Sequence, residues 1–326
     1  MRDELLILPF LLTAAVLTYL GRDLWVGSAV AGQALTFAAV TGGALLVLLL
    51  ARVRRDLRDS RLQLARKEAE LNFAREVQKA LFPKTYPQGR GLAFHGVCIP
   101  AQFISGDYFD VLELPDGRQV FALADISGKG VSAAILMANL QALLRREARN
   151  GERPDELCWR LNNHFWEVSP PASFATFFYA EWDPVGRRLH YVNAGHNRPM
   201  LFSGDKVKRL CEGGLPLGIF PESRYNTGSV ELQRGDLLLV YSDGVSEAGF
   251  SREEFGTARI RQAVGQAGSR DPVQVIERIL SEVRRFAEDD QHDDMTLLAV
   301  SAVAVSPTEE ETGQSRGERV LHENQR

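Results

Sequence analysis

Two long runs of apolar, uncharged residues open the chain, at 5–20 and 28–50. A helix needs about 20 apolar residues to cross the hydrocarbon core of a bilayer. The second run meets that length, whereas the first is shorter and contains Pro9. The pattern predicts a two-helix transmembrane hairpin over residues 1–50. A signal peptide cleaved at the small residues 29–31 is the alternative, although the start of the chain carries no net positive charge.

Arginines cluster directly after the second apolar run, while the loop between the two runs holds only Arg22. The cluster consists of Arg52, Arg54, Arg55, Arg58 and Arg61. Short segments rich in Lys and Arg stay on the cytoplasmic side of a membrane. We therefore expect a multi-pass protein of the plasma (inner) membrane, in contact with lipid, whose remaining residues are cytoplasmic.

The segment 51–82 contains neither glycine nor proline, and leucines recur at every seventh position, at Leu57, Leu64 and Leu71. This spacing predicts a continuous helical linker that ends before Pro83. A heptad of leucines is typical of a dimeric coiled coil, which predicts a homodimer through this segment. A single helix resting on the following domain explains the same pattern, and the sequence leaves both interpretations open.

From residue 83 to 305 the pattern changes to short apolar strands in hairpins, with turns predicted at 115–117 and 184–186. Separate blocks have helical spacing, at 132–149, 154–167, 257–267 and 272–288. Strands grouped in hairpins with helices in separate blocks indicate an α+β layered domain. The last residues, 306–326, are polar and predict a disordered tail. The domains expected are therefore 1–50, 51–82, 83–305 and 306–326.

Composition excludes several classes of protein. The formal net charge is −4, so no basic character indicates nucleic-acid binding. Cys98, Cys158 and Cys211 lie far apart and form no CxxC pair, which argues against a disulfide framework or a zinc site.

Gly128-Lys129 resembles the end of a phosphate-binding P-loop. That motif needs glycine at 123 and Ser or Thr at 130, where this chain has Leu123 and Gly130, so the nucleotide interpretation fails.

Aspartates recur where strongly apolar strands meet loops. They are Asp107 in "ISGDYFD", Asp125 in "ALADISG", Asp243 in "LLLVYSDG", and Asp293 and Asp294 in "HDDMTLLAV". Any one Asp-Gly pair after a strand is usually an ordinary turn. Several carboxylates that converged would repel one another unless divalent cations lay between them. Oxygen ligands suit magnesium or manganese rather than zinc.

The motifs taken together and in order resemble the SpoIIE-like (RsbU-like) branch of the PPM-type metal-dependent serine/threonine protein phosphatases. They are "ISGDYFD", "ADISGKG", "FATFFYAEWDP", "NAGHNRP", "GGLPLG", "YSDGVSEA" and "HDDMT". "AREVQKALFPKTYP" is similar to the helical lead-in of that branch, so the resemblance covers about 74–305. It implies a four-layer α-β-β-α sandwich of antiparallel sheets with two divalent cations, Mn²⁺ or Mg²⁺, at one edge.

The resemblance also implies a role for each aspartate. Asp125 would bridge both cations, and the backbone carbonyl of Ile126 would bind one of them. Asp243 and Asp293 would hold the other cation, with Asp125 and Asp243 the main catalytic residues. Asp107 would bind through metal-bound water. Asp294 is the alternative to Asp293, although the "DDMT" pattern favours the first. A water activated by the two cations would then attack a phosphoserine or phosphothreonine directly.

This sequence departs from the family pattern in the groups that assist the leaving group and the phosphate. Ser127 stands where many eukaryotic members have a histidine that is proposed to protonate the leaving group, and Ile126 replaces a glycine. The arginine with which those enzymes hold phosphate has no clear match. His196 is a candidate proton donor, but a structural histidine at a strand-to-turn corner is the simpler interpretation. His292 either orients the neighbouring carboxylates or caps a loop.

The expected function is thus that of a membrane-anchored protein serine/threonine phosphatase. In the family that the chain resembles, bacterial members often act on anti-sigma-factor antagonist proteins, so a phosphorylated protein of that type is the expected substrate and partner. The alternative is an inactive, membrane-tethered binding scaffold, against which the retention of all the acidic positions argues.

Overall fold

A computed structural model gives the fold of this protein. It describes residues 29–84, 91–249, 253–288 and 290–303, together with residues 15, 16 and 19. The chain divides into two compact units, Met1–Leu71 and Asn72–Arg326. Most of the first predicted membrane span and the whole predicted tail, 306–326, lie outside the described residues.

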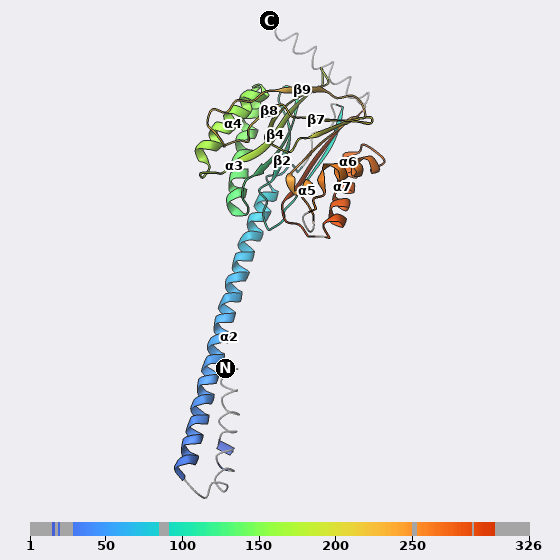
Figure 1. The fold of residues 1–326 in the computed structure, drawn as a ribbon. Helices are drawn as coiled ribbons and strands as arrows, with labels where there is room; N and C mark the ends of the chain where they lie inside the picture. The colour runs from blue at the N-terminus through green and yellow to red at the C-terminus, as the bar shows by residue number, and fades with distance from the viewer. Residues whose placement is uncertain are drawn as a thin grey trace. The chain divides into compact units, whose positions relative to one another are not determined.

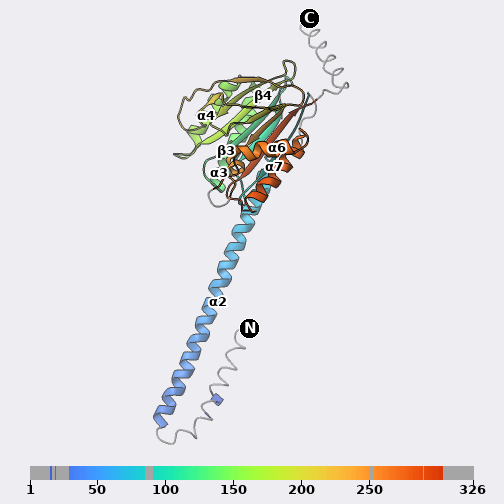
Figure 2. The ribbon, with the colours of Figure 1, turned by 45° about the vertical axis from the view of Figure 1, so that its right-hand side comes forward.

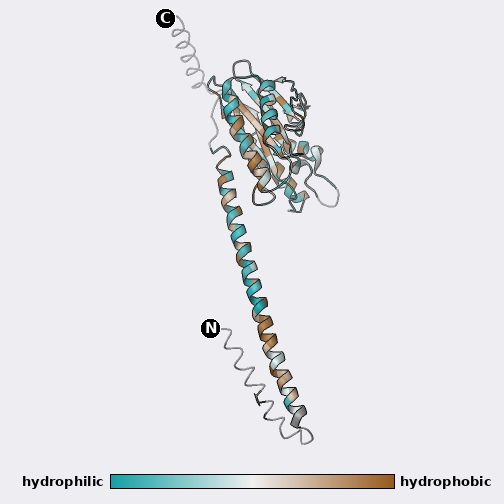
Figure 3. Ribbon diagram, turned by 90° about the vertical axis from the view of Figure 1, so that its left-hand side faces the viewer, coloured by the Kyte–Doolittle hydropathy of each residue, from teal (hydrophilic) through white to brown (hydrophobic). Residues whose placement is uncertain are grey.

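One helix, α2 (Ala29–Lys79), contains both the second apolar run and most of the predicted linker. Its first part is hydrophobic and its second part hydrophilic, as the change from brown to teal in Figure 3 shows. By length and composition the part from Gly32 onward could cross a membrane, although signal sequences and buried core helices pass the same test. Leu57 and Leu64, two of the heptad leucines, are more than half exposed. The helix ends before Pro83, as predicted.

The second unit contains two β-sheets packed face to face. The first has five strands in the order β1 (Leu92–Ile99), β11 (Met295–Ala302), β10 (Leu237–Tyr241), β6 (Met200–Ser203) and β7 (Lys206–Arg209). The second follows the order β2 (Tyr108–Glu113), β3 (Gln119–Ile126), β4 (Ala175–Asp183), β5 (Arg188–Ala194) and β8 (Gly213–Gly214), with β9 (Gly228–Glu231) also paired to β5. We call them the β1–β11 sheet and the β2–β3 sheet.

Helices cover the outer face of each sheet. The β2–β3 sheet carries α3 (Val131–Glu147), the short η1 (Ala148–Asn150) and α4 (Pro154–Val168), and the β1–β11 sheet carries α6 (Gly256–Gln266) and α7 (Pro272–Phe286). A single turn, α5 (Asp243–Ser246), follows β10. Figures 1 and 2 show the green and orange helix pairs on opposite sides of the sheets. The predicted α-β-β-α sandwich is therefore confirmed.

Three hydrophobic clusters fill the three spaces between these four layers. Strand β3 shows how the sequence produces this arrangement. Ala122 and Ala124 face α3 and α4, whereas Phe121 and Leu123 face the other sheet. Because successive side chains of a strand point to opposite faces, a strand buried on both sides must be apolar throughout. The unbroken apolar runs before Asp125 and Asp243 reflect this double burial.

Local sequence signals were largely confirmed. The 115–117 and 184–186 turns join antiparallel neighbours, β2 with β3 and β4 with β5. Asp271 caps α7, because its Oδ1 accepts a hydrogen bond from the backbone N–H of Gln274. One expectation was wrong in part, since β5 and β8 run parallel and the β2–β3 sheet is mixed. A two-residue strand within a glycine-rich loop has no side-chain pattern from which its direction could be predicted.

Candidate active site

Asp107 and Asp125 lie together at one end of the β2–β3 sheet. Asp107 directly precedes β2, and Asp125 is the second-last residue of β3. The antiparallel register pairs Tyr108 with Ala124, so the two aspartates sit side by side across neighbouring strands. Asp107 is buried, while Asp125 is partly exposed at the edge.

The other predicted aspartates lie at one end of the β1–β11 sheet. Asp243 begins α5 just after β10, and Asp293 and Asp294 directly precede β11. The backbone N–H of Ser242 donates to the carbonyl of Thr296 at 3.0 Å, which joins the ends of the two strands. A Cβ at Gly244 would come 2.1 Å from the carbonyl oxygen of Asp294. The glycine after Asp243 is therefore required for this close approach.

Asp294 joins the two sheet ends. Its Oδ2 accepts hydrogen bonds from the Ser105 hydroxyl (2.8 Å) and the Gly106 N–H (2.7 Å), and its Oδ1 accepts from the Ala101 N–H (2.8 Å). These donors belong to the loop that leads into Asp107. The carboxylate of Asp294 thus holds the β1–β2 loop against the start of β11, which brings all five aspartates to one edge of the sandwich.

The aspartates are close enough to change one another's protonation. Burial, followed by repulsion from Asp125, raises the pKa of Asp107 well above its ordinary value. Burial, followed by the charges of Asp243, Asp293 and Asp294, raises the pKa of Asp125 to about 7. The pKa of Asp243 is also raised, by burial and then by Asp293. Each of these shifts has the sign expected for carboxylates that share a site.

Several observations bear on whether these residues fit divalent cations. As the side chains stand, no three His, Cys, Asp or Glu residues of the described ranges are arranged to hold a metal ion. However, Oδ2 of Asp107 is buried without a hydrogen-bond partner. Within the described residues, no Lys, Arg or His forms an ion pair with Asp107, Asp125 or Asp243. A buried oxygen without a donor and mutual repulsion are both relieved by a hard cation, so the donor set fits magnesium or manganese.

The carbonyl oxygen of Ile126 lies close to Gly106. A Cβ at position 106 would come 3.2 Å from the carbonyl oxygen of Ile126, so glycine at this position keeps side-chain atoms away from that oxygen. Ile126 itself is fully buried as the last residue of β3. A larger residue at 106 would therefore crowd the carbonyl oxygen that the family resemblance names as a ligand.

The three further candidates from the sequence have mainly structural partners. Nδ1 of the buried His196 lies 2.8 Å from the Thr176 hydroxyl, and the backbone N–H of His196 donates to Oδ1 of Asn193. The Ser127 hydroxyl accepts a hydrogen bond from the N–H of Phe174. His292, for which the sequence left open an orienting role and a loop-capping role, is exposed and pairs with Asp290. These contacts favour the structural interpretation of His196.

Two contributors to this edge were not found from the sequence. Gln78, in the last turn of α2, donates from Nε2 to the Ser105 carbonyl (2.7 Å) and accepts at Oε1 from the Ser105 N–H (2.9 Å). Ser105 in turn donates to Asp294 and accepts from the N–H of Asp107. A polar residue in a charged helix has no distinguishing pattern, so only the fold shows this connection.

Known proteins with similar sequences and structures include phosphatases of the type that the sequence motifs resemble. Phosphoserine phosphatase RsbU of Bacillus subtilis (strain 168) is 25% identical over 235 residues, which cover 72% of this chain and 70% of that protein. The RsbU and RsbW domains of Rv1364c from Mycobacterium tuberculosis superimpose with a TM-score of 0.61 at 28% identity, covering 68% of this chain and 63% of that one. RsbX, crystallised with magnesium, shares the fold at 18% identity and a TM-score of 0.51, covering 67% and 98%.

The model of the family described as Stage II sporulation protein E (SpoIIE) matches residues 115–303, which is more than half of the chain. The matched region contains Asp125, Asp243, Asp293 and Asp294 and all the strands from β3 onward. Sequence, fold and the acidic edge therefore agree, and the chain belongs to the SpoIIE family.

Proposed function

We propose that this protein is a metal-dependent phosphoprotein phosphatase that hydrolyses phosphoserine or phosphothreonine on a partner protein. The observation that carries the proposal is the meeting of aspartates from two separate sheets at one edge, with Oδ2 of Asp107 buried and unpartnered. Membership of the SpoIIE family and the similarity to a protein named phosphoserine phosphatase RsbU support it.

The proposal gives each aspartate a task. Asp125, near the end of β3 and within reach of the charges of Asp243 and Asp293, would bridge two cations, with Ile126 contributing its carbonyl oxygen. Asp243 and Asp293 would bind from the β1–β11 sheet, while Asp107 would accept a hydrogen bond from bound water. Asp294 already accepts three hydrogen bonds, so we assign it the role of holding the loop. Bound Mg²⁺ or Mn²⁺ would supply an activated water and neutralise the phosphoryl oxygens.

A phosphatase assay with a matched variant tests this function. The full-length protein should release phosphate from a phosphoserine protein in Mn²⁺ or Mg²⁺ and lose that activity with a chelator. Asp243→Asn keeps the shape of the side chain but removes its charge, so hydrolysis should fall by about 1,000-fold or more. If the wild-type protein bound such a substrate without hydrolysing it, the scaffold alternative would be the better description.

The proposed substrate is a phosphorylated anti-sigma-factor antagonist. The similarity to phosphoserine phosphatase RsbU supports this choice. Antagonist proteins phosphorylated on serine, purified from the same cell, should be dephosphorylated faster than an unrelated phosphoprotein such as casein. Equal rates on both would remove the support for this substrate class.

We also propose the domain plan of a membrane hairpin at 1–50, a linker at 51–82, a phosphatase domain at 83–305 and a tail at 306–326. The apolar first half of α2 and the arginines that follow it support membrane anchoring with the phosphatase domain in the cytoplasm. Reporter fusions after residues 24 and 82 should locate the first outside and the second inside the plasma membrane. A cytoplasmic reporter at residue 24 would contradict the multi-pass plan.

The linker is proposed to form a homodimer and to carry signals to the active site. Exposed leucines on α2 support pairing, and Gln78 provides a direct connection to Ser105. Cross-linking at position 64 should trap a dimer, and deletion of residues 1–50 should change basal activity or its dependence on Mn²⁺. Identical manganese titrations for the two proteins would count against such coupling.

A further inference from the structure

Lys129 is held in an unusual loop between Asp125 and helix α3. The glycines on either side of it have positive φ angles, 93° at Gly128 and 76° at Gly130. A Cβ at either glycine would meet no atom within 4 Å, so space does not require glycine there. The backbone conformation does, because L-residues with side chains rarely adopt it. The conformation of this loop therefore depends on both glycines, and Lys129 lies between them.

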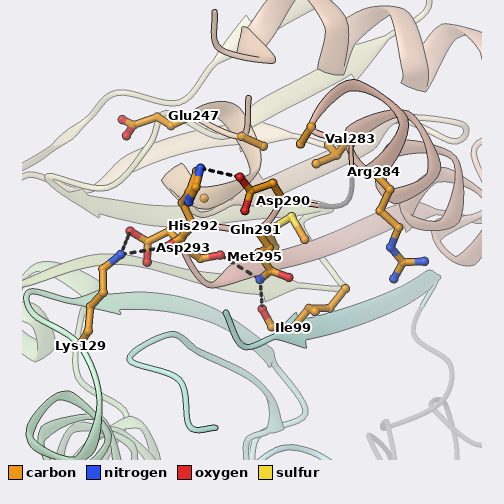
Figure 4. A pocket seen from close by; sticks show the side chains of 13 residues that line it. Ile99, Lys129, Glu247, Val283, Arg284, Asp290, Gln291, His292, Asp293 and Met295 are labelled. Carbon is orange, nitrogen blue, oxygen red and sulfur yellow. Dashed lines mark hydrogen bonds and ion pairs between the residues drawn. The ribbon is translucent and has the colours of Figure 1, made fainter. Parts of the chain in front are cut away.

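The side chain of Lys129 reaches across to the opposite sheet. Its Nζ lies 3.0 Å from Oδ2 of Asp293 and donates to the carbonyl oxygen of His292 at 2.9 Å, as Figure 4 shows. The side chain is still 53% exposed. An ammonium group has three donors, and these contacts use two of them. A third donor thus remains for a group that arrives from solvent.

Charge makes this position important for the proposed reaction. Within the described parts of the chain, Lys129 is the one Lys or Arg that forms an ion pair with any of the five aspartates. A phosphoryl group that approaches an edge lined by carboxylates meets repulsion unless cations face it. Helix α3 begins two residues further on, at Val131; its N-terminus has no side-chain cap and carries partial positive charge.

Space for a substrate lies directly beside Lys129. A cavity of about 220 Å³ opens between the end of α7, the start of α5 and the segment before β11. The residues that line it include Lys129 and Asp293 and the apolar Val283 and Met295. Figure 4 shows Lys129 and Asp293 at one side of this cavity. A phosphorylated side chain at the acidic edge would leave neighbouring substrate residues next to the cavity.

We propose that Lys129 binds the phosphoryl group of the substrate through the free donor of its ammonium, in the role for which the sequence offers no arginine. This inference rests on the proposed phosphatase function. It assigns phosphate binding to the Gly128-Lys129 pair, which resembles the end of a P-loop but does not match the P-loop motif. A lysine acts on phosphate as a point charge, so it needs no fixed planar geometry.

Three variants separate phosphate binding from a merely structural ion pair. Lys129→Met removes the charge and keeps the aliphatic stem, Lys129→Arg keeps the charge, and Lys208→Met removes a lysine from the exposed edge strand β7 as the control. For each, calorimetry gives the Kd for Mg²⁺ and, at saturating Mg²⁺, the Kd for inorganic phosphate. Steady-state hydrolysis of a phosphoserine peptide gives kcat and KM, and thermal melting shows whether the variant is folded.

We expect Lys129→Met to raise the Kd for phosphate and the KM for the peptide about tenfold at saturating Mg²⁺. Lys129→Arg should keep the Kd for phosphate and the KM for the peptide much closer to the wild-type values. Lys208→Met should leave both constants within twofold of wild type. A Lys129→Met protein with unchanged phosphate affinity would overturn the inference, as would wild-type protein that binds no phosphate. Hydrolysis that is absent from the wild type, with phosphate binding that still depends on Lys129, would instead overturn the proposed function alone.

Discussion

Two aspartates, one in β2 and one directly before it, have opposite environments. Asp110 is completely buried in β2, yet its Oδ2 receives the Tyr108 hydroxyl and the Nε of Arg145 (2.7 Å), and its Oδ1 receives the Arg145 Nη2 (3.1 Å). Asp107, three residues earlier, is also buried, but its Oδ2 has no hydrogen-bond partner and its nearest charged neighbours are other carboxylates. Burial alone therefore does not distinguish the two residues.

The difference lies in what the chain itself provides. The same arrangement of tyrosine, acid and arginine occurs again on β4, where Glu181 accepts from Tyr179 and pairs with Arg118. In both clusters the protein satisfies the buried acid with its own donors, which is what a structural carboxylate requires. Oδ2 of Asp107 instead has no donor, and the charge of Asp125 raises the pKa of Asp107. A carboxylate left in this condition indicates a ligand that comes from outside the chain.

The largest expected effect is at Asp125, where a substitution should abolish activity without reducing folding stability. Asp125→Asn should reduce kcat by about 1,000-fold or more, because the proposed bridging ligand is lost. Without divalent cations at pH 8, the same substitution should leave the free energy of unfolding unchanged or raise it by about 1 kcal/mol, since a repelling charge is removed. Urea unfolding and a phosphatase assay measure the two quantities. A clear loss of stability would show that Asp125, like Asp110, is a structural carboxylate.

The opposite result is expected at Asp110. Asp110→Asn should lower the free energy of unfolding by about 2 kcal/mol, because it removes the charge that pairs with the partly exposed Arg145. The folded variant should keep its kcat within about threefold of wild type at saturating metal. Chemical denaturation supplies the first value, and a loss of activity without loss of stability would contradict the comparison.

A further effect, seen only below neutral pH, concerns His196, a buried group that binds no proton near neutral pH. Burial lowers its pKa from 6.5 to about 4. The unfolded chain therefore binds a proton that the folded chain does not between these pH values. The stability it contributes is present above pH 6.5 and is lost as the pH falls toward 4, by about 3 kcal/mol. His196→Asn should flatten the dependence of the melting temperature on pH in this range, and an equally steep profile would disprove the assignment.

Local sequence signals predicted a large part of the fold. Apolar runs located β3, β10 and β11, glycine-containing turns located two hairpins, and Asp271 with Pro272 marked the start of α7. All of these features depend on residues close together in the chain. The aspartates were also identified, but only the family resemblance supplied a reason for them to meet, because no local pattern records contacts across more than 150 residues.

The sequence by itself determined the main helices and the long strands of the hairpins, the position of the uncharged run and its flanking arginines, and which carboxylates stand at strand ends. These follow from side-chain alternation, turn chemistry and the solvation of charge. Only the tertiary structure decided that Asp294 closes the edge, that Gln78 connects a helix to it, and that Lys129 reaches Asp293 from the other sheet. Such contacts depend on how two sheets pack, and packing is set by the whole core rather than by any one segment.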